Sequence, residues 1–191
     1  MQKACEGEES YTREQEEEIR LGLEEGLDIG LYARPGYTAR QMRVLRQGLE
    51  AGVSLIRLAG EGKSASEMQR DLFKRVAERA GVNAVDFYPD QLEEIRCGLH
   101  DGIPVACFAD PSLSSRQMRE IRLGLAHGVR LLDYVTAACP ADIMRRVREA
   151  LEAGKPMPEL TAPHDSSRRV PSASSVTCGC IRIHERMARM V

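Results

Sequence analysis

This sequence contains no tryptophan, and aromatic residues make up only 4% of its 191 residues. Proteins that bind single-stranded nucleic acid stack bases on aromatic side chains, and ligand cavities are commonly lined by them. An excess of charge of one sign is also missing, because 27 basic residues oppose 29 acidic ones and the net charge is −2. The composition therefore argues against a nucleic-acid binder and against a protein that binds anionic membranes.

Long apolar runs are missing as well. The first ten residues, MQKACEGEES, form an acidic extension without the apolar stretch of a signal peptide. No run is long and apolar enough to cross a bilayer, so we expect a cytoplasmic protein with no membrane partner. The six cysteines are too sparse for a secreted disulfide scaffold, which predicts reduced thiols.

The sequence does contain an internal repeat. Two degenerate repeats, marked by Glu67 and Ile143, share the register of the clear ones, and the period is 26 residues except for one interval of 24. Six repeats thus cover residues 11–155, and such a period is typical of a solenoid. Close copies of one dodecamer, written QMREIRLGLAHG in its last copy, occupy residues 15–26, 41–52, 91–102 and 117–128.

Each repeat has the signals of a helix with a defined start and end. A hydroxyl residue stands three positions before the repeat glutamine or glutamate, as in Thr12–Gln15, which predicts a capping box. Apolar residues then follow at helical spacing, as at Met42, Leu45 and Leu49. A glycine in mid-helix costs about 1 kcal/mol relative to alanine, so we expect it to permit close approach of the neighbouring repeat. These mid-helix glycines are Gly22, Gly48, Gly98 and Gly124; the glycines expected to end the helices are Gly26, Gly52, Gly102, Gly128 and Gly154.

The segment after each helix end can be a short strand or a second short helix. Strict alternation would bury Arg57 and Asp133, whereas helical spacing selects apolar or small residues in every repeat. Asp28 and Ser54 are suitable N-caps, and Pro104 suits a helix start. We therefore predict an all-α solenoid in which each repeat is a long helix and a helix of one or two turns. An α/β solenoid with short strands is the alternative.

The string Q-[ML]-x-x-[IL]-R-x-G-L-x-x-G-[LIV], followed by YARP in the first repeat and FADP in the fourth, resembles tandem repeats of uncharacterised proteins of gut Firmicutes. Those proteins are often encoded near mobile elements. The resemblance covers most of residues 11–155 and implies a repeat protein without a transferable activity. The third repeat departs from the pattern at Lys74 and Arg75, and its apolar stripe runs on to Gly81. We expect a longer helix there and a bend in the array. The irregular repeat can form a functional groove, or it can be a repeat that has lost the pattern.

One arginine recurs five residues after the repeat glutamine. It can form a ladder of guanidinium groups that binds phosphates or carboxylates of a partner. It can instead form ion pairs along its own helix, as in Arg20–Glu24, Arg46–Glu50 and Arg148–Glu152, and we favour this structural reading. The candidate partner-binding residues are Arg20, Arg46, Arg96, Arg122 and Arg148.

Residues with catalytic or metal-binding chemistry are few. Cys97 and His100 are neighbours on one helix, with Asp101 next to them, but nothing marks an oxyanion hole. In the tail, residues 156–191, a proline- and serine-rich stretch typical of a flexible linker precedes a basic end. Three residues of that end have metal-ligand chemistry but lack a fourth close donor: Cys178, Cys180 and His184.

The same basic end can alternatively form a short amphipathic helix. Ile183, Met187 and Met190 then share one side, which docks on the array or on a partner. Taken together, the sequence predicts a non-enzymatic protein-interaction or adaptor protein without a cofactor, serving a mobile element. A nucleic-acid-binding repeat protein that uses the arginine ladder is the second hypothesis.

Overall fold

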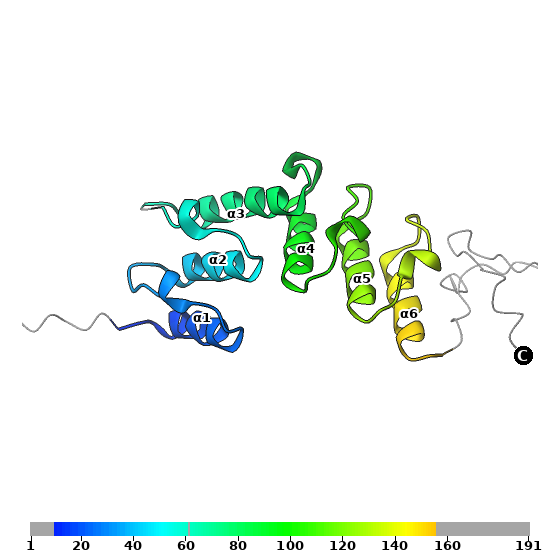
Figure 1. Cartoon of the computed structure of the whole chain (residues 1–191), viewed down its shortest axis with the longest axis horizontal. Coiled ribbons are helices and arrows are strands. Elements are labelled where there is room, and N and C mark those ends of the chain that lie inside the picture. Colours follow the sequence, from blue (N-terminus) through cyan, green and yellow to red (C-terminus); the bar gives the residue numbers. More distant parts are fainter. Residues whose placement is uncertain (1–9, 61, 156–191) are drawn as a thin grey trace, which may run out of the picture. The chain divides into compact units, whose positions relative to one another are not determined.

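The computed structural model describes residues 10–60 and 62–155 of the chain, and this part is helical (Figure 1). The repeats fall into two compact units, divided between Gly102 and Ile103. Within the described residues no β-sheet occurs, so the all-α prediction is confirmed and the strand alternative is wrong. The long helices are α1 (Arg13–Glu24), α2 (Ala39–Glu50), α3 (Ala65–Ala80), α4 (Pro89–His100), α5 (Ser115–Ala126) and α6 (Ala141–Glu152).

The predicted capping boxes form at four of these helices. At α1, Thr12 Oγ1 accepts a hydrogen bond from the Gln15 N–H at 3.3 Å, and Gln15 Oε1 accepts one from the Thr12 N–H at 2.6 Å. The same exchange occurs at the starts of α2, α3 and α5. At α4 the Tyr88 N–H donates to Gln91 Oε1 at 2.7 Å, and Pro89 takes the first helical position. Each exchange satisfies backbone donors that a helix start otherwise leaves open.

The helix ends also follow the prediction. Gly26 has a φ of +68°, and the Leu27 N–H donates to the Gly22 carbonyl at 2.8 Å. This pattern stops the helix with a left-handed residue, which a glycine adopts without steric cost. The other glycines expected at helix ends likewise have positive φ values: Gly52, Gly102, Gly128 and Gly154.

The second helix of a repeat is a single turn of 3₁₀ helix. Asp28 caps the first turn as predicted, since its Oδ1 accepts from the Gly30 N–H at 3.0 Å, but Ser54 makes no side-chain cap. The residue after most of these turns is buried, as at Tyr32, Leu58 and Phe108, whereas Cys107 and Asp133 at the ends of two turns are exposed. The turns are η1 (Ile29–Leu31), η2 (Leu55–Arg57), η3 (Ala84–Asp86), η4 (Val105–Cys107) and η5 (Leu131–Asp133).

The mid-helix glycines Gly22 and Gly48 make room chiefly for the turn of their own repeat, and the neighbouring repeat also comes into contact at Gly48 and at Gly124, where Arg148 lies 3.7 Å from a built Cβ. A Cβ on Gly22 would lie 1.8 Å from the Tyr32 hydroxyl oxygen. A Cβ on Gly48 would lie 3.0 Å from Leu58, but 3.5 Å from Leu72 of the next repeat. The cost of a glycine in a helix is thus offset by seating the buried residue that follows the 3₁₀ turn.

In the N-terminal unit, helices α1 to α4 pack in sequential order. Helix α3 has 16 residues where its neighbours have 12, as its apolar stripe predicts. Figure 1 shows α1, α2 and α3 running along one another and α4 turned across the C-terminal end of α3, so the direction changes after the third repeat. The core contains Met42, Leu45, Met68, Leu72, Val76 and Ile95, each with no exposed surface.

The C-terminal unit has a core of its own. Helices α5 and α6 pack against each other and against η5. Its core residues are Met118, Ile121, Leu131, Met144 and Val147. Among the described residues of both units, no helix is both long and apolar enough to span a membrane.

The repeat glutamine also joins one repeat to the next. Gln117 Oε1 accepts a hydrogen bond from the Ser114 N–H at the start of its own helix. Gln117 Nε2 donates to the carbonyl oxygens of Ala137 and Cys139, which lie 20 and 22 residues further along the chain, at 2.8 Å each. Gln15 makes the same bonds to Pro35 and Tyr37, and Gln41 Nε2 donates to the Lys63 carbonyl at 2.8 Å. We call this arrangement the glutamine clamp.

The third repeat has a glutamate in place of the glutamine. Hydrogen bonds from Ser64 lower the pKa of Glu67, so its side chain is a carboxylate. A carboxylate accepts but does not donate, so Glu67 caps α3 and cannot make the clamp. This is the repeat after which the helix direction changes.

Candidate functional site

The five arginines predicted as partner-binding residues project from equivalent positions of α1, α2, α4, α5 and α6. In α3 the equivalent position is Leu72, which is fully buried. In the N-terminal unit the arginine therefore recurs on α1, α2 and α4 but not on α3, and in the C-terminal unit it recurs on α5 and α6. What these guanidinium groups can bind depends on which carboxylates already surround them.

Arg46 connects α2 to α1. Its Nη2 lies 2.9 Å from Glu18 Oε2, and its Nη1 contacts Glu50 on the next turn of α2. Glu18 is only 2% exposed and also receives a hydrogen bond from Arg43 Nε at 2.7 Å. Two cations therefore neutralise this buried carboxylate, as burial of a charge requires.

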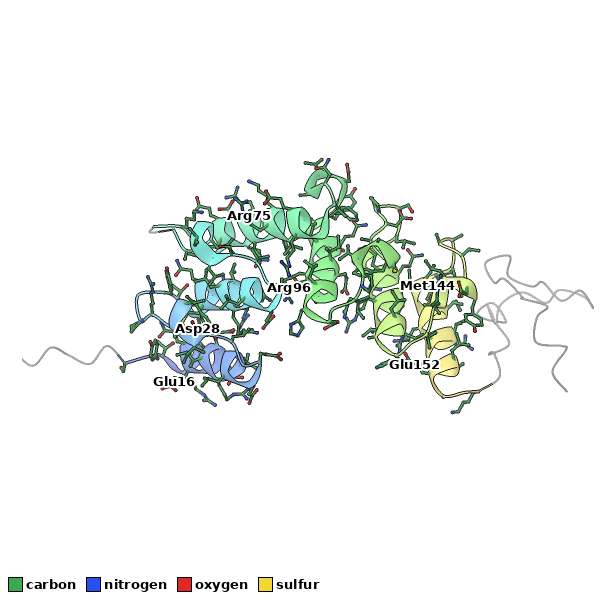
Figure 2. The ribbon with its side chains drawn as sticks, in the orientation of Figure 1. Glu16, Asp28, Arg75, Arg96, Met144 and Glu152 are labelled. Atoms are coloured by element: carbon green, nitrogen blue, oxygen red, sulfur yellow. The ribbon has the colours of Figure 1, made fainter. Side chains whose placement is uncertain are left out.

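Arg96 reaches from α4 back to α2 (Figure 2). Its Nη1 lies 3.0 Å from Glu50 Oε2, and its Nη2 lies 2.9 Å from Glu93 Oε1. Burial lowers the pKa of the Arg96 guanidinium, but the hydrogen bond and charge of Glu93, with the charge of Glu50, raise it by more. Arg96 is therefore a cation held between two carboxylates, and only 7% of it is exposed.

The C-terminal unit repeats the arrangement. Arg148 Nε lies 2.9 Å from Glu120 on α5, and Arg148 Nη1 lies 2.8 Å from Glu152 on its own helix. Glu18 and Arg46 are separated by the same 28 residues as Glu120 and Arg148. The carboxylate of one repeat thus pairs with the arginine of the next.

The other two arginines differ in exposure. Arg122 is buried, whereas about half of the Arg20 side chain is exposed and pairs with Glu17 and Glu24. The predicted pairs along single helices, Arg20–Glu24, Arg46–Glu50 and Arg148–Glu152, are all confirmed. Arg46, Arg96 and Arg148 are thus occupied in joining helices, and Arg20 is the ladder arginine with substantial exposure.

Several exposed apolar side chains lie on the 3₁₀ turns, in addition to Leu23 on α1 and Tyr88 at the start of α4. In η2 and η3 the residue that follows the turn is buried, whereas the middle residue lies in solvent: Ile56 is 89% exposed and Val85 is 84% exposed. Leu31, at the end of the first turn, is 46% exposed. We call these three residues of the N-terminal unit the turn ridge.

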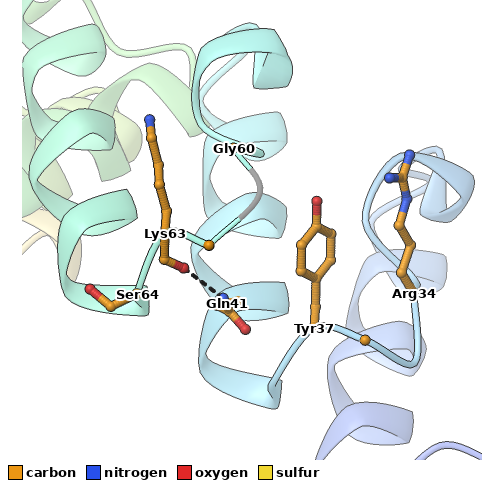
Figure 3. A pocket seen from close by; sticks show the side chains of 8 residues that line it. Arg34, Tyr37, Gln41, Gly60, Lys63 and Ser64 are labelled. Carbon is orange, nitrogen blue, oxygen red and sulfur yellow. Dashed lines mark hydrogen bonds between the residues drawn. The ribbon is translucent and has the colours of Figure 1, made fainter.

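Two shallow grooves lie along the edge of the N-terminal unit where the long helices begin. The first groove, ≈ 540 Å³, runs between the loops that precede α1 and α2, and the second, ≈ 550 Å³, between the loops that precede α2 and α3. Gly36 and Tyr37 line both grooves. Figure 3 shows the second groove, with Arg34, Tyr37 and Lys63 around it.

The predicted thiol–imidazole pair has other neighbours. Cys97 accepts a hydrogen bond from Arg96 Nη2 at 3.5 Å, and His100 is exposed, with its Nε2 3.8 Å from Glu25 at the end of α1. Within residues 10–60 and 62–155 no cluster of three or more metal-ligand side chains occurs. The candidate metal ligands Cys178, Cys180 and His184, and the amphipathic end with Ile183, Met187 and Met190, lie outside the described residues.

Comparison of the chain with protein-family models, with curated proteins and with solved structures finds no match. Sequence reasoning identified the arginines but missed Glu18 and Glu120 as their partners and missed the turn ridge. The carboxylate three residues after the repeat glutamine was a readable signal, whereas the ridge depends on the 3₁₀ geometry.

Proposed function

We propose that this chain is a non-enzymatic protein-interaction or adaptor protein. The observation that carries the proposal is the turn ridge, where large apolar side chains stand in solvent on successive repeats. Exposed apolar patches on folded proteins commonly mark interaction sites. Full burial of one such side chain against a partner contributes about 1.5–3 kcal/mol, so a few of them can support specific binding.

A repeat array suits this function because successive repeats present equivalent positions to one long partner surface. The residues of the turn ridge come from the 3₁₀ turns of three consecutive repeats: Ile56 and Val85 are the middle residues of their turns, and Leu31 is the last residue of its turn. The resemblance to repeat proteins encoded near mobile elements supports a partner encoded by such an element.

Nucleic-acid binding by the arginine ladder is the second candidate, and it has less support. Binding to a nucleic acid requires cationic side chains that neutralise its phosphates and so release the counterions condensed on the polymer. Arg46, Arg96 and Arg148 are instead paired with carboxylates at 3.0 Å or less and are largely buried. Breaking these pairs to bind phosphate would leave buried carboxylates such as Glu18 uncompensated, at a cost of several kcal/mol.

The test is affinity capture with the full chain from its native host. The variant Ile56→Ser/Val85→Ser removes two apolar side chains of the turn ridge at positions where the fold buries little of them. The control is Ala106→Ser, the exposed middle residue of η4, which receives the same new side chain. We expect one or more proteins to be captured by the wild type and the control and to be lost with the double variant.

Two results would contradict the proposal. One is repeated capture in which the wild-type chain returns no protein. The other is capture of the same proteins, at equal yield, by the wild type and the double variant, since binding would then not use the turn ridge.

A further inference from the structure

Where one long helix follows another, one of its sides packs on the helix before it. In α2 this side is marked by Arg46, which pairs with Glu18 of α1, and in α6 by Arg148, which pairs with Glu120 of α5. The residues one and four positions after the repeat glutamine or its equivalent share this side by helical spacing. In α2 and α6 these residues have no exposed surface: Met42, Leu45, Met144 and Val147.

The same side of α1 has no preceding helix among residues 10–60 and 62–155. Its apolar residues are Ile19, which is only partly buried, and Leu23, which is 59% exposed. The Arg20 side chain, which also lies on this side, is 52% exposed, against 12% for Arg46. We call Glu16, Ile19, Arg20 and Leu23 the open face of α1.

The end of an array does not by itself require apolar residues there. Terminal repeats of solenoids commonly have a polar outer face. In α6, Arg146 takes the position from which Glu120 of α5 contacts the following helix, and Glu149 follows on the same side. Both are exposed, so this side of α6 is polar, whereas the open face of α1 keeps Ile19 and Leu23. The apolar pair therefore points to a partner.

Charge around the open face favours a basic partner. The exposed charged residues of α1 are four glutamates and two arginines. Glu16, which takes the place of Met42, is exposed and makes no ion pair with any residue in 10–60 or 62–155 (Figure 2). A second copy that presented the same face would bring like charges together, which is unfavourable. A lysine or arginine beside an apolar stripe would instead pair with Glu16.

We propose that the open face of α1 binds an amphipathic helix of another protein, with an apolar stripe flanked by lysine or arginine. The stripe covers Ile19 and Leu23, as a preceding helix covers the same side of α2 and α6. Helices of this kind are recognised by apolar residues at helical spacing. The proposal uses none of the residues of the turn ridge, so it does not depend on the function proposed for that surface.

Two synthetic helical peptides of equal length test the proposal on the full chain. Both have leucine on one side, and the remaining positions are lysine in one peptide and glutamate in the other. We expect the lysine peptide to bind at least about tenfold more tightly, measured by fluorescence anisotropy, because like charges across an interface are unfavourable. On binding, the methyl NMR signals of Ile19 and Leu23 should shift.

A pair of matched variants locates the binding. Leu23→Lys should reduce the affinity for the lysine peptide by at least about tenfold, because it removes an apolar contact and adds a like charge. Val85→Lys places the same side chain on the turn ridge, at a position that is 84% exposed, and should leave the affinity unchanged.

Four results would overturn the proposal. The first two are absence of binding by the lysine peptide and equal affinity for the two peptides. An equal loss of affinity with Val85→Lys would show that the peptide does not select the open face. A free chain that sediments as a dimer, and as a monomer with Leu23→Lys, would show that a second copy covers the face instead.

Discussion

At the scale of single residues, the repeat glutamine explains most about how this chain is built. Its carboxamide has an acceptor oxygen and two donor hydrogens, and the fold uses both ends at once. The oxygen caps the helix that carries the glutamine, and the nitrogen donates to the loop of the next repeat. Neither alanine nor glutamate can do both.

The substitution Gln117→Glu tests the clamp. It keeps the capping oxygen but removes two hydrogen bonds, each contributing about 1 kcal/mol. A new negative charge near the helix start returns only about 0.3–1 kcal/mol. We expect the free energy of unfolding, measured in urea, to fall by about 1–2 kcal/mol. Ser114→Ala, which weakens the cap and keeps the clamp, should cost about 1 kcal/mol. Unchanged stability of Gln117→Glu would show that the clamp contributes nothing.

The space that Gly22 leaves for the Tyr32 side chain gives a second test at this scale. Gly22→Ala places a Cβ 1.8 Å from the Tyr32 hydroxyl oxygen, so overpacking of about 1–3 kcal/mol should exceed the helix-propensity gain of about 1 kcal/mol. Tyr32→Phe removes that oxygen together with its hydrogen bond to the Glu18 carbonyl. In a double-mutant cycle we therefore expect Gly22→Ala to be less destabilising in the Tyr32→Phe background. Additive effects would mean that the two positions do not compete for space.

At the scale of helices, ion pairs between repeats repeat with the same spacing in both compact units. Glu18 pairs with Arg46, and Glu120 pairs with Arg148. The pairs are buried enough that removing one partner leaves an uncompensated charge. They therefore fix which helix faces which neighbour.

Glu18→Ala should be strongly destabilising for this reason. It leaves Arg46 with Glu50 as its remaining partner, so we expect a loss of about 3 kcal/mol, at the lower end of the range for buried pairs. Glu16→Ala, at an exposed position of the same helix, is the control and should change stability by less than about 0.5 kcal/mol. Denaturant unfolding compares the two. Equal effects would show that the Glu18 pairs are energetically neutral.

Acid should weaken the C-terminal unit through Glu152. Burial raises the pKa of the Glu152 carboxyl, but hydrogen bonds from Arg148 and His127 lower it by more, to below its ordinary value of 4.5. The stability that this carboxylate contributes is therefore present above pH 4.5 and is lost as the pH falls through the lower, folded-state pKa. Unfolding measured from neutral pH to about pH 3 should show a smaller loss for Glu152→Gln than for the wild type. Parallel pH profiles would contradict this.

The helices themselves were predictable from sequence because both of their ends have local signals. Thr12 with Gln15 marks a start, and Gly26 marks an end, without reference to any distant residue. The close contact at Gly22 was predicted only in part, since the sequence shows the glycine but not which side chain approaches it. The Glu18–Arg46 pair was missed because a contact across 28 residues depends on how repeats stack.

At the scale of the whole molecule, each compact unit has its own buried core, and four of the ladder arginines, Arg20, Arg46, Arg96 and Arg148, are paired with carboxylates. The net charge of −2 gives a nucleic acid no general attraction. The candidate interaction features of the N-terminal unit are therefore the apolar turn ridge, the open face of α1 and the two shallow grooves at the helix-start edge.

A titration with a DNA duplex separates the two functional hypotheses. Binding through the ladder would weaken steeply with salt, and Arg20→Gln would reduce the salt slope by about one. We expect that Arg20→Gln does not change the affinity for the duplex at low salt, measured by fluorescence anisotropy. A salt-dependent affinity that falls in this variant would favour the nucleic-acid hypothesis.

The glutamine clamp has a consequence for how such arrays change over generations. Its acceptor is a peptide carbonyl, as at Ala137 and Cys139, so the receiving loop needs no particular side chain. The clamp itself therefore needs no compensating substitution when a 26-residue period is duplicated or deleted. The side chains that must still match at a new junction are those of the ion pairs and of the core.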